Sequence, residues 1–487
     1  MRLLVVLRVL GILLIAEGLF MLPSVLWSLF DGESAWLGIA YAMGCTLLMG
    51  LFVFYATPPL QNVWPQESLA AVVIGWIMVC FVGTLPFLFS NTVSSFTDAL
   101  FESVSGFTTT GASIFADVES LPHGILLWRS VTHFFGGMGI ITFTSLVLPN
   151  SALGGTGLLK MESAAMLQDQ SRPRLREWLR IILLIYIGFC FLETVLLVFL
   201  GLSVFDAINH AFASVATGGF STKNASIGAF HNVYVEMVAI TFMFAGGMNF
   251  SVYYMFFRKN FKQALSRDDV RFYFLFTIVS ILSIAFINYG NVNDTWTSAI
   301  RDSTFTVVSL NTTTGFVTAD YEKWPQFCQL LLVLLMLVGA CFGSTCGAIK
   351  NIRIIVLVKA VVKEIRQMIH PTGVFVVRVN QMSLRDRDIT FIGLFVSMYL
   401  ILFLFISLLL CISGMDIVSA LGGTAACMGG VGPGLGLVGP MDNYGGLEGM
   451  AKWLFMFAML LGRLEIFSFF ALLLPEFWSR SSMRRTP

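Results

Sequence analysis

Charged side chains are the scarcest class of residue in this sequence. Asp, Glu, Lys and Arg make up 12% of the 487 residues, whereas an ordinary soluble protein carries about a quarter. A soluble chain of this length would need far more polar surface, so that class of protein is excluded. The net charge of +1 says little about partners, and no nucleic-acid partner is predicted.

Catalytic and metal-binding patterns are missing as well. The eight cysteines lie in or beside apolar stretches, with no CxxC pair and no ligand spacing, and we interpret them as packing residues. His133 and His210 belong to no HExxH motif, and there is no constellation of a nucleophile with a base. We therefore predict that the protein is not an enzyme and that it binds no organic cofactor.

Long apolar runs, by contrast, are abundant. A helix rises about 1.5 Å per residue, so roughly 20 residues cross a hydrocarbon core of about 30 Å. The sequence predicts an all-α polytopic membrane protein with ten spans, because most of its ten apolar runs are long enough. These runs are Leu3 to Phe30, Leu37 to Ala56, Leu69 to Phe89, Ile125 to Leu148, Ile181 to Leu200, Val233 to Phe256, Phe272 to Ile287, Leu330 to Phe342, Ile389 to Ile412 and Trp453 to Leu474.

Positive charge is sorted between the segments that join these runs. Of the 29 Lys and Arg residues, 23 lie within residues 2–8, 160–180, 258–271, 350–387 and 480–485. These segments fall on one side of the membrane if the chain starts in the cytoplasm. The positive-inside rule then predicts that both termini are cytoplasmic and that the number of spans is even.

An internal repeat is the strongest signal in the chain. Four segments start at an Asp and reach a Gly thirteen positions later: DALFESVSGFTTTG from Asp98, DAINHAFASVATGG from Asp206, DSTFTVVSLNTTTG from Asp302 and DIVSALGGTAACMG from Asp416. Asp is a good N-cap, and the following ten or so residues would form a helix of about 15 Å, half a membrane. One such segment would be an ordinary external loop. Four at one spacing predict half-helices that enter the bilayer and stop near its middle.

Glycine and small residues follow each half-helix, and we predict that they form a cation filter. Glycine lets successive carbonyl oxygens point at one axis, and four such segments could replace the water shell of a cation. The predicted ion-binding residues are Thr109, Thr110, Gly111, Thr217, Gly218, Gly219, Thr313, Thr314, Gly315, Gly429 and Gly430. The fourth segment lacks the Thr run, so the choice among Gly429, Gly430 and Gly432 stays open.

This repeat sets the predicted organisation of the chain. Two N-terminal transmembrane helices occupy residues 1–66, and four units of helix, pore loop and helix surround a central pore. The units span residues 67–150, 151–260, 261–370 and 371–487.

A gate is predicted in the third unit. A continuous helix over residues 325–358 would reach about 50 Å, well beyond the hydrocarbon core, so it must break or tilt. The expected break runs from Gly339 to Gly347 and includes Gly343, Ser344 and Thr345. The alternative is a flexible kink that serves packing alone.

Two cations complete the predicted gate. Arg463 interrupts the last apolar run, and a charge at that depth is costly unless it faces a cavity or a partner. We place it against the loop, with snorkelling to the cytoplasm as the alternative. Lys350 follows the loop and acts either in the same way or as a topogenic charge.

The filter segments TTTGA, ATGGF, TTTGF and GGVGPGLG, together with GACFGSTCGAIK (339–350) and LLGRLEIF (460–467), resemble the Trk/Ktr/HKT superfamily, and specifically its TrkH-type membrane subunits. The resemblance covers essentially the whole chain. It implies potassium (K+) uptake across the bacterial inner membrane, an intramembrane loop that blocks the pore, a homodimer and a cytoplasmic TrkA-type ring of nucleotide-binding regulatory subunits. In this superfamily, Ser at the position of Gly111 accompanies sodium permeation.

Alternatives to a gated potassium channel remain at this stage. An ion-coupled secondary transporter, carrying potassium with protons or sodium, could use the same scaffold. The basic segment from Arg353 to Arg387 could bind membrane lipid or the regulatory ring, and the sequence does not separate these two roles.

Overall fold

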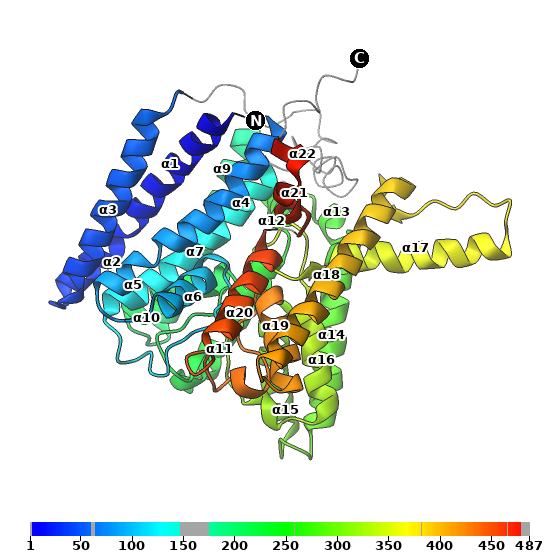
Figure 1. The fold of residues 1–487 in the computed structure, drawn as a ribbon. Helices are drawn as coiled ribbons and strands as arrows, with labels where there is room; N and C mark the ends of the chain where they lie inside the picture. Colours follow the sequence, from blue (N-terminus) through cyan, green and yellow to red (C-terminus); the bar gives the residue numbers. More distant parts are fainter. Residues whose placement is uncertain are drawn as a thin grey trace.

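The computed structural model describes residues 2–59, 64–146, 175–257, 259–380, 382–464 and 466–478. Within these ranges the protein is a bundle of helices with two short two-stranded sheets (Figure 1). In the part of the chain that the structure describes, six helices are long and apolar enough to cross a membrane, and two bent helix pairs raise the number to eight. The predicted all-α class is therefore confirmed. The other two predicted spans correspond to the helix that starts at His123 and to a helix of only 12 residues, Gln326–Leu337.

An N-terminal hairpin lies at one edge of the bundle (Figure 1). It consists of α1 (Leu3–Phe20), its continuation α2 (Leu22–Phe30) and α3 (Ala35–Ala56). Glycines allow close approach, because a Cβ on Gly18 would lie 2.7 Å from Leu47 and one on Gly50 2.9 Å from Ile15. Small residues at such crossings are a common device for packing helices in membranes.

Four units of similar order follow the hairpin, each with a long helix, a half-helix, an extended segment and a second helix. The first contains α4 (Pro65–Val82), α5 (Leu85–Phe89), α6 (Phe96–Phe107) and α7 (His123–Leu146), and the second contains α9 (Leu175–Phe199), α10 (Val204–Val215), η2 (Ser226–Phe230), α11 (Val233–Gly247), α12 (Phe250–Phe257) and α13 (Phe261–Leu265). The third contains α14 (Asp268–Asn288), α15 (Trp296–Asn311), η3 (Tyr321–Lys323), α16 (Gln326–Leu337), β1 (Val338–Gly339), β2 (Ile349–Lys350) and α17 (Asn351–Ile369). The fourth follows the hairpin β3 (Arg378–Val379) and β4 (Met382–Ser383), and contains α18 (Asp386–Ile412), α19 (Ile417–Gly429), η4 (Gly436–Val438), α20 (Gly449–Arg463), α21 (Ile466–Leu473) and α22 (Pro475–Trp478).

The predicted unit boundaries stay predictions, and several residues behind the charge argument cannot be placed. Lys160, Arg172, Arg174, Arg258, Arg480, Arg484 and Arg485 lie outside the described residues. The first turn of α1 and the last helix, α22, lie at the same end of the bundle (Figure 1).

The half-helices begin earlier than predicted in three units. The N-caps of α6, α10 and α15 are Ser95, Ser203 and Thr295, whose hydroxyls accept hydrogen bonds from backbone N–H groups in the first turn. Asp416 alone caps its helix directly. The assignment of the other three Asp residues as N-caps was wrong. Asp98 and Asp206 instead lie in the first turn, where a carboxylate still favours the positive end of the helix dipole.

Breaks in the second helices are more general than predicted. The sequence placed one in the third unit, and there α16 ends at Leu337 and α17 starts at Asn351. In addition, α11 and α12 meet at 98° and α20 and α21 at 108°. The break in the second unit is hydrogen bonded to the loop of the third: Cys341 N–H donates to Gly247 O at 3.1 Å, and Phe250 N–H to Gly343 O at 3.2 Å. A broken helix at membrane depth needs such partners.

Candidate filter and gate

Four glycines, one from each unit, form a closed ring. They are Gly111, Gly219, Gly315 and Gly432, and all have left-handed φ angles of 81°, 82°, 79° and 95°. A Cβ atom on each glycine would collide with a carbonyl oxygen of the next unit in turn: that of Gly218, of Thr314, of Val431 and, at 2.6 Å, of Thr110. The order returns to its start, so the four extended segments surround one axis.

The local backbone of the four segments is the same. The residue before each ring glycine donates its N–H to a carbonyl near the end of its own half-helix: Thr110 to Ser105 at 2.9 Å, and Gly218 to Ala213, Thr314 to Ser309 and Val431 to Ala426 at 2.8 Å each. The residue two places before each glycine is also left-handed: Thr109, Thr217, Thr313 and Gly430.

This shared backbone pattern identifies the ring glycine of the fourth segment. Gly432, rather than Gly429 or Gly430, takes the position of the other three ring glycines. Gly430 corresponds to Thr109, and Gly429 is the last residue of α19. The predicted list therefore places the fourth segment too early, because it counted thirteen residues from the Asp of each repeat. Asp416 is itself the N-cap of α19, whereas the N-caps of α6 and α10 lie three residues before Asp98 and Asp206.

Carbonyl oxygens and the ends of the half-helices make the surroundings of the ring favourable for a cation. Each half-helix ends just before its segment, so the negative ends of four helix dipoles face this region. All the threonines of the first three segments are at most 2% exposed. On the side of the following loops, the four glycines line a cavity of about 150 Å³, together with Arg129 and Asp442.

A loop over residues 340–348 lies against the opposite side of the ring. The Thr345 hydroxyl is 3.2 Å from the carbonyl oxygens of Val215 and Gly246 and 3.1 Å from the Thr217 hydroxyl. Gly347 N–H donates to Thr313 Oγ1 at 3.0 Å. A Cβ on Gly347 would also collide with a backbone carbonyl of the fourth unit, at the end of α19. The loop therefore contacts three of the four units.

Arg463, the last residue of α20, holds this loop. Its Nη1 donates to Thr345 O at 2.7 Å and its Nη2 to Gly136 O at 3.0 Å. The residue is 5% exposed, which favours the predicted contact with the loop over snorkelling. Lys350 Nζ donates to the Cys346 carbonyl and, at 3.4 Å, to Ser344 Oγ. Both cations thus bind the loop, beside a cavity of about 40 Å³.

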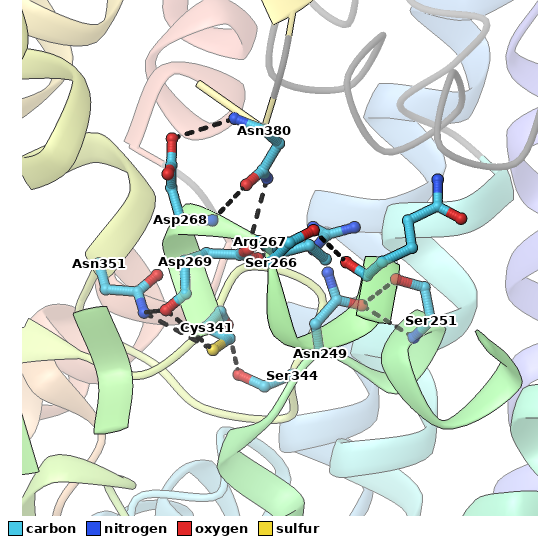
Figure 2. Close-up of polar contacts among 11 residues, drawn as sticks. Asn249, Ser251, Ser266, Arg267, Asp268, Asp269, Cys341, Ser344, Asn351 and Asn380 are labelled. Atoms are coloured by element: carbon cyan, nitrogen blue, oxygen red, sulfur yellow. Dashed lines mark hydrogen bonds and ion pairs between the residues drawn. The ribbon is translucent and has the colours of Figure 1, made fainter. Parts of the chain in front are cut away.

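The root of the loop belongs to a polar network at the start of α14 (Figure 2). Asn351 Nδ2 donates to Asp269 O at 3.0 Å, and the Asp269 carboxylate accepts from Arg267 at 3.0 and 2.9 Å. Asn380, in the turn between β3 and β4, donates to Asp269 Oδ1 at 3.3 Å and accepts from Asp268 N–H at 2.7 Å. The β3–β4 hairpin is therefore linked to the root of the loop.

Helix α17 projects away from the bundle between this loop and the hairpin (Figure 1). Lys359 joins it to the start of α14 through Asp268 at 2.7 Å, and Lys363 joins it to Asp386 at 2.7 Å. The bond to Asp386 raises the pKa of Lys363. Motion of α17 or the hairpin would consequently act on the root of the loop.

Two carboxylates outside the spans have lowered pKa values. Hydrogen bonds from the Ser419 side chain and backbone lower the pKa of Asp416 at the start of α19. A hydrogen bond from the Asn224 amide lowers that of Asp117, and so ties the outer loops of the first two units together. Burial raises the pKa of Glu322 in the outer loop of the third unit.

One cluster in the described part of the chain has metal-ligand geometry. Ligand atoms of Asp31, Glu33 and His123 lie within 4.8 Å of one another. His123 Nδ1 is bonded to Asp31 at 2.6 Å, and Glu33 accepts the N–H groups of His123 and Gly124 at 2.6 and 3.2 Å. These hydrogen bonds account for the three side chains as a cap at the start of α7.

A buried ion pair next to the ring, between Arg129 and Glu102, was not predicted from the sequence. Arg129 Nε donates to Glu102 Oε1 at 2.6 Å, and the two residues are 2% and 0% exposed. A signal was present, since Arg129 interrupts an apolar run, and charges at such depth mark functional or paired sites. Lys452 was missed in the same way, and it binds Asp98 at 2.6 Å.

Comparisons with known proteins agree with this architecture. Residues 43–480 match the family described as "TrkH: Cation transport protein". The chain is 33% identical over 488 residues to "Trk system potassium uptake protein TrkH" of Halomonas elongata, covering 99% of this chain and 100% of the relative. It is 36% identical over 418 residues to the protein of the same name from Escherichia coli, covering 85% and 86%. The crystal structure of the potassium transporter TrkH from Vibrio parahaemolyticus matches with a TM-score of 0.89 and 30% identity, over 98% of this chain and 100% of that one.

Proposed function

Because this chain belongs to the TrkH family of cation transport proteins, we propose that it takes up potassium through the ring of Gly111, Gly219, Gly315 and Gly432. The observation that carries the proposal is the closure of this ring, in which each glycine lies against a carbonyl of the next unit. Carbonyl oxygens in such a ring replace the water shell of a dehydrated cation. K+ is the cargo of this site.

The short filter sets the expected selectivity. The left-handed turn before each ring glycine is shared by all four units, but the residues that follow are Ala112, Phe220, Phe316 and Pro433. We therefore expect fewer ion positions than in a filter built of longer identical strands. Discrimination between potassium and sodium should therefore depend on this one level. A side chain at Gly111 would displace the Gly218 carbonyl and disturb the ring directly.

The loop over residues 340–348 is the proposed gate. Its bonds to Thr217, Thr313 and Arg463 place it against the inner side of the ring, where it would block the pathway. Opening requires that these bonds break together. The link from the loop root through Asp269 to Asn380 supports control from the cytoplasmic hairpin, where a TrkA-type nucleotide-binding ring would bind.

The proposed setting is the bacterial inner membrane. The basic residues predict cytoplasmic termini, and the shared position of α1 and α22 at one end of the bundle supports this orientation. A homodimer is expected from the family, and the part of α17 that projects from the bundle (Figure 1) exposes Val361, Ile365 and Met368, which a second copy would cover. Ion-coupled symport on the same scaffold stays the second candidate, since the ring by itself does not distinguish passive from coupled flow.

Cation flux into liposomes tests the proposal. The purified chain should carry potassium in preference to sodium, and Gly111→Ser should erode that preference. Gly188→Ser is a matched control, because its Cβ would meet no atom within 4 Å. If the parent carries no cation, or if Gly111→Ser leaves selectivity intact, the four-segment filter is wrong. An imposed proton or sodium gradient that drives potassium uptake would instead favour coupled transport.

A further inference from the structure

The buried pair of Arg129 and Glu102 has no part in the ring or the gate described above. We propose that Arg129 is a positioning residue for ion selection: it fixes the distance between the filter segments of the first and second units. This inference rests on the proposed function, because it assigns to the pair a role in that filter.

Within the first unit, the pair holds the chain just beyond Gly111. Glu102, in the half-helix α6, accepts hydrogen bonds from Ile114 N–H at 3.0 Å and from the Ser113 hydroxyl at 3.1 Å. Arg129 Nε donates to Glu102 at 2.6 Å, and its Nη2 donates to Ser113 Oγ at 3.1 Å. The segment beyond Gly111 is thus bound to both α6 and α7.

The same guanidinium reaches the second unit. Arg129 Nη1 donates to Ser221 O at 3.2 Å, two residues beyond Gly219. The guanidinium carbon lies 4.1 Å from the centroid of the Phe220 ring, and the His133 ring, one turn further along α7, stacks on Phe220 at 4.1 Å. One planar cation therefore binds the segments of two units, and a flexible ammonium could not keep all of these bonds.

This arrangement is specific to the first unit among the second helices that can be aligned. The second helices of three units can be aligned by a glycine that packs against the end of the half-helix of the same unit. Gly136, Gly246 and Gly462 contact the carbonyl oxygens of Phe107, Val215 and Met428, and each of these three residues lies four positions before its ring glycine. Seven residues before these glycines, the first unit has Arg129, the second Ala239 and the fourth Phe455. The clamp is therefore an addition to the shared scaffold.

Beside the ring glycines, the other junctions are bound by neutral groups, while the ion pair of Lys452 with Asp98 joins the fourth and first units near the start of α6. Tyr444 donates its N–H to Ser113 O at 2.9 Å and its hydroxyl to Gly432 O at 2.7 Å, which joins the fourth unit to the first. Gly228 N–H donates to Val317 O at 3.1 Å and joins the second to the third. At the junction of the first and second units, the same task falls to a guanidinium that lines the outer cavity.

Glu102 makes a cation tolerable at this place. An unpaired guanidinium beside the pathway would repel an entering potassium ion, and the adjacent carboxylate cancels that charge. The pair thereby supplies a rigid fork without a net field. This separates two roles that experiment can distinguish, the position of the fork and the balance of charge.

The decisive measurement is the ratio of potassium to sodium permeability in liposomes, with the thermal melt of each variant as a folding check. We expect Arg129→Lys, which keeps the charge and loses the fork, to lower this ratio about tenfold, which corresponds to about 1.4 kcal/mol of lost discrimination. The double variant Glu102→Gln with Arg129→Gln, which stays neutral, should lower it to the same extent. The control Arg301→Lys, in an ion pair with Glu236 away from the ring, should leave it unchanged.

Each result decides between the roles. A potassium-to-sodium permeability ratio of Arg129→Lys within about twofold of the parent value overturns the proposal. A double variant with the selectivity of the parent also overturns it, because only the balance of charge would then matter. If Arg129→Lys does not fold, Ser113→Ala removes the hydroxyl shared by Arg129 and Glu102 and should also lower the ratio; an unchanged ratio would contradict the clamp. A parent without potassium selectivity refutes the proposed function itself, which is a separate outcome.

Discussion

Removal of the Arg463 guanidinium should open the pathway. Arg463→Met keeps most of the apolar volume of the side chain and removes its bonds to Thr345 O and Gly136 O, at 2.7 and 3.0 Å. Both bonds involve a charged donor in a buried site, and each such bond contributes about 1.5 kcal/mol or more to the state that contains it. Because Thr345 belongs to the loop, its bond to Arg463 stabilises the closed position, whereas the bond to Gly136 O joins α20 to α7 and involves no loop residue.

The expected effect follows from the bond to Thr345 O. A loss of about 1.5 kcal/mol from the closed state raises the ratio of open to closed molecules about tenfold. Potassium flux through the variant, measured in liposomes without any regulatory protein, should rise accordingly while selectivity over sodium is retained, since the ring glycines are untouched.

The control is Arg301→Met, which removes one positive charge from the ion pair with Glu236 outside the pathway. Its flux should match that of the parent. A folded Arg463→Met protein with parental or lower flux would refute the reasoning, because it would show that the guanidinium does not hold the loop closed. A rise in flux with lost selectivity would show that Arg463 supports the filter instead.

Three further predictions concern the ring, the loop and one cap. Gly432→Asn should abolish potassium selectivity in flux assays, because its Cβ would lie 2.6 Å from Thr110 O. Gly430→Asn should retain selectivity, because the nearest atom of another segment to its Cβ, in Gly347, is 3.9 Å away and Asn tolerates a left-handed backbone. Equal effects of the two substitutions would contradict the assignment of Gly432 to the ring. Thr345→Val should raise unregulated flux about fivefold, as loss of one hydrogen bond of about 1 kcal/mol requires, and unchanged flux would remove the hydroxyl from the gate. Asp416→Ala should lower the free energy of unfolding by about 1 kcal/mol at neutral pH, because the helix loses its N-cap. The pKa of Asp416 is below its ordinary 3.8, so this loss should be complete above pH 3.8 and should vanish as the pH falls through the lowered pKa. A difference that does not depend on pH would exclude the carboxylate as the cap.

The outline of this protein could be predicted from local sequence. Apolar runs predicted the helical membrane class, and the fourfold Asp-to-Gly spacing predicted half-helices followed by glycine segments. Gly111, Gly219 and Gly315 were identified because each lies thirteen residues after the Asp of its repeat. The helix caps were less accessible, since Ser, Thr and Asp are all good N-caps, and Ser95 and Asp98 lie close enough to compete for the same role.

The remaining features depend on contacts between units. The sequence by itself determined the class, the repeat, three of the four ring glycines and the glycine-rich break in the third unit, because these follow from hydrophobic length and from residue types that act within a few positions. Tertiary structure alone decided that Gly432 completes the ring, that Arg463 bonds the loop to α7, and that Arg129 clamps two segments. Each of these depends on which backbone carbonyl of a distant unit lies within reach, and that distance has no trace in local sequence.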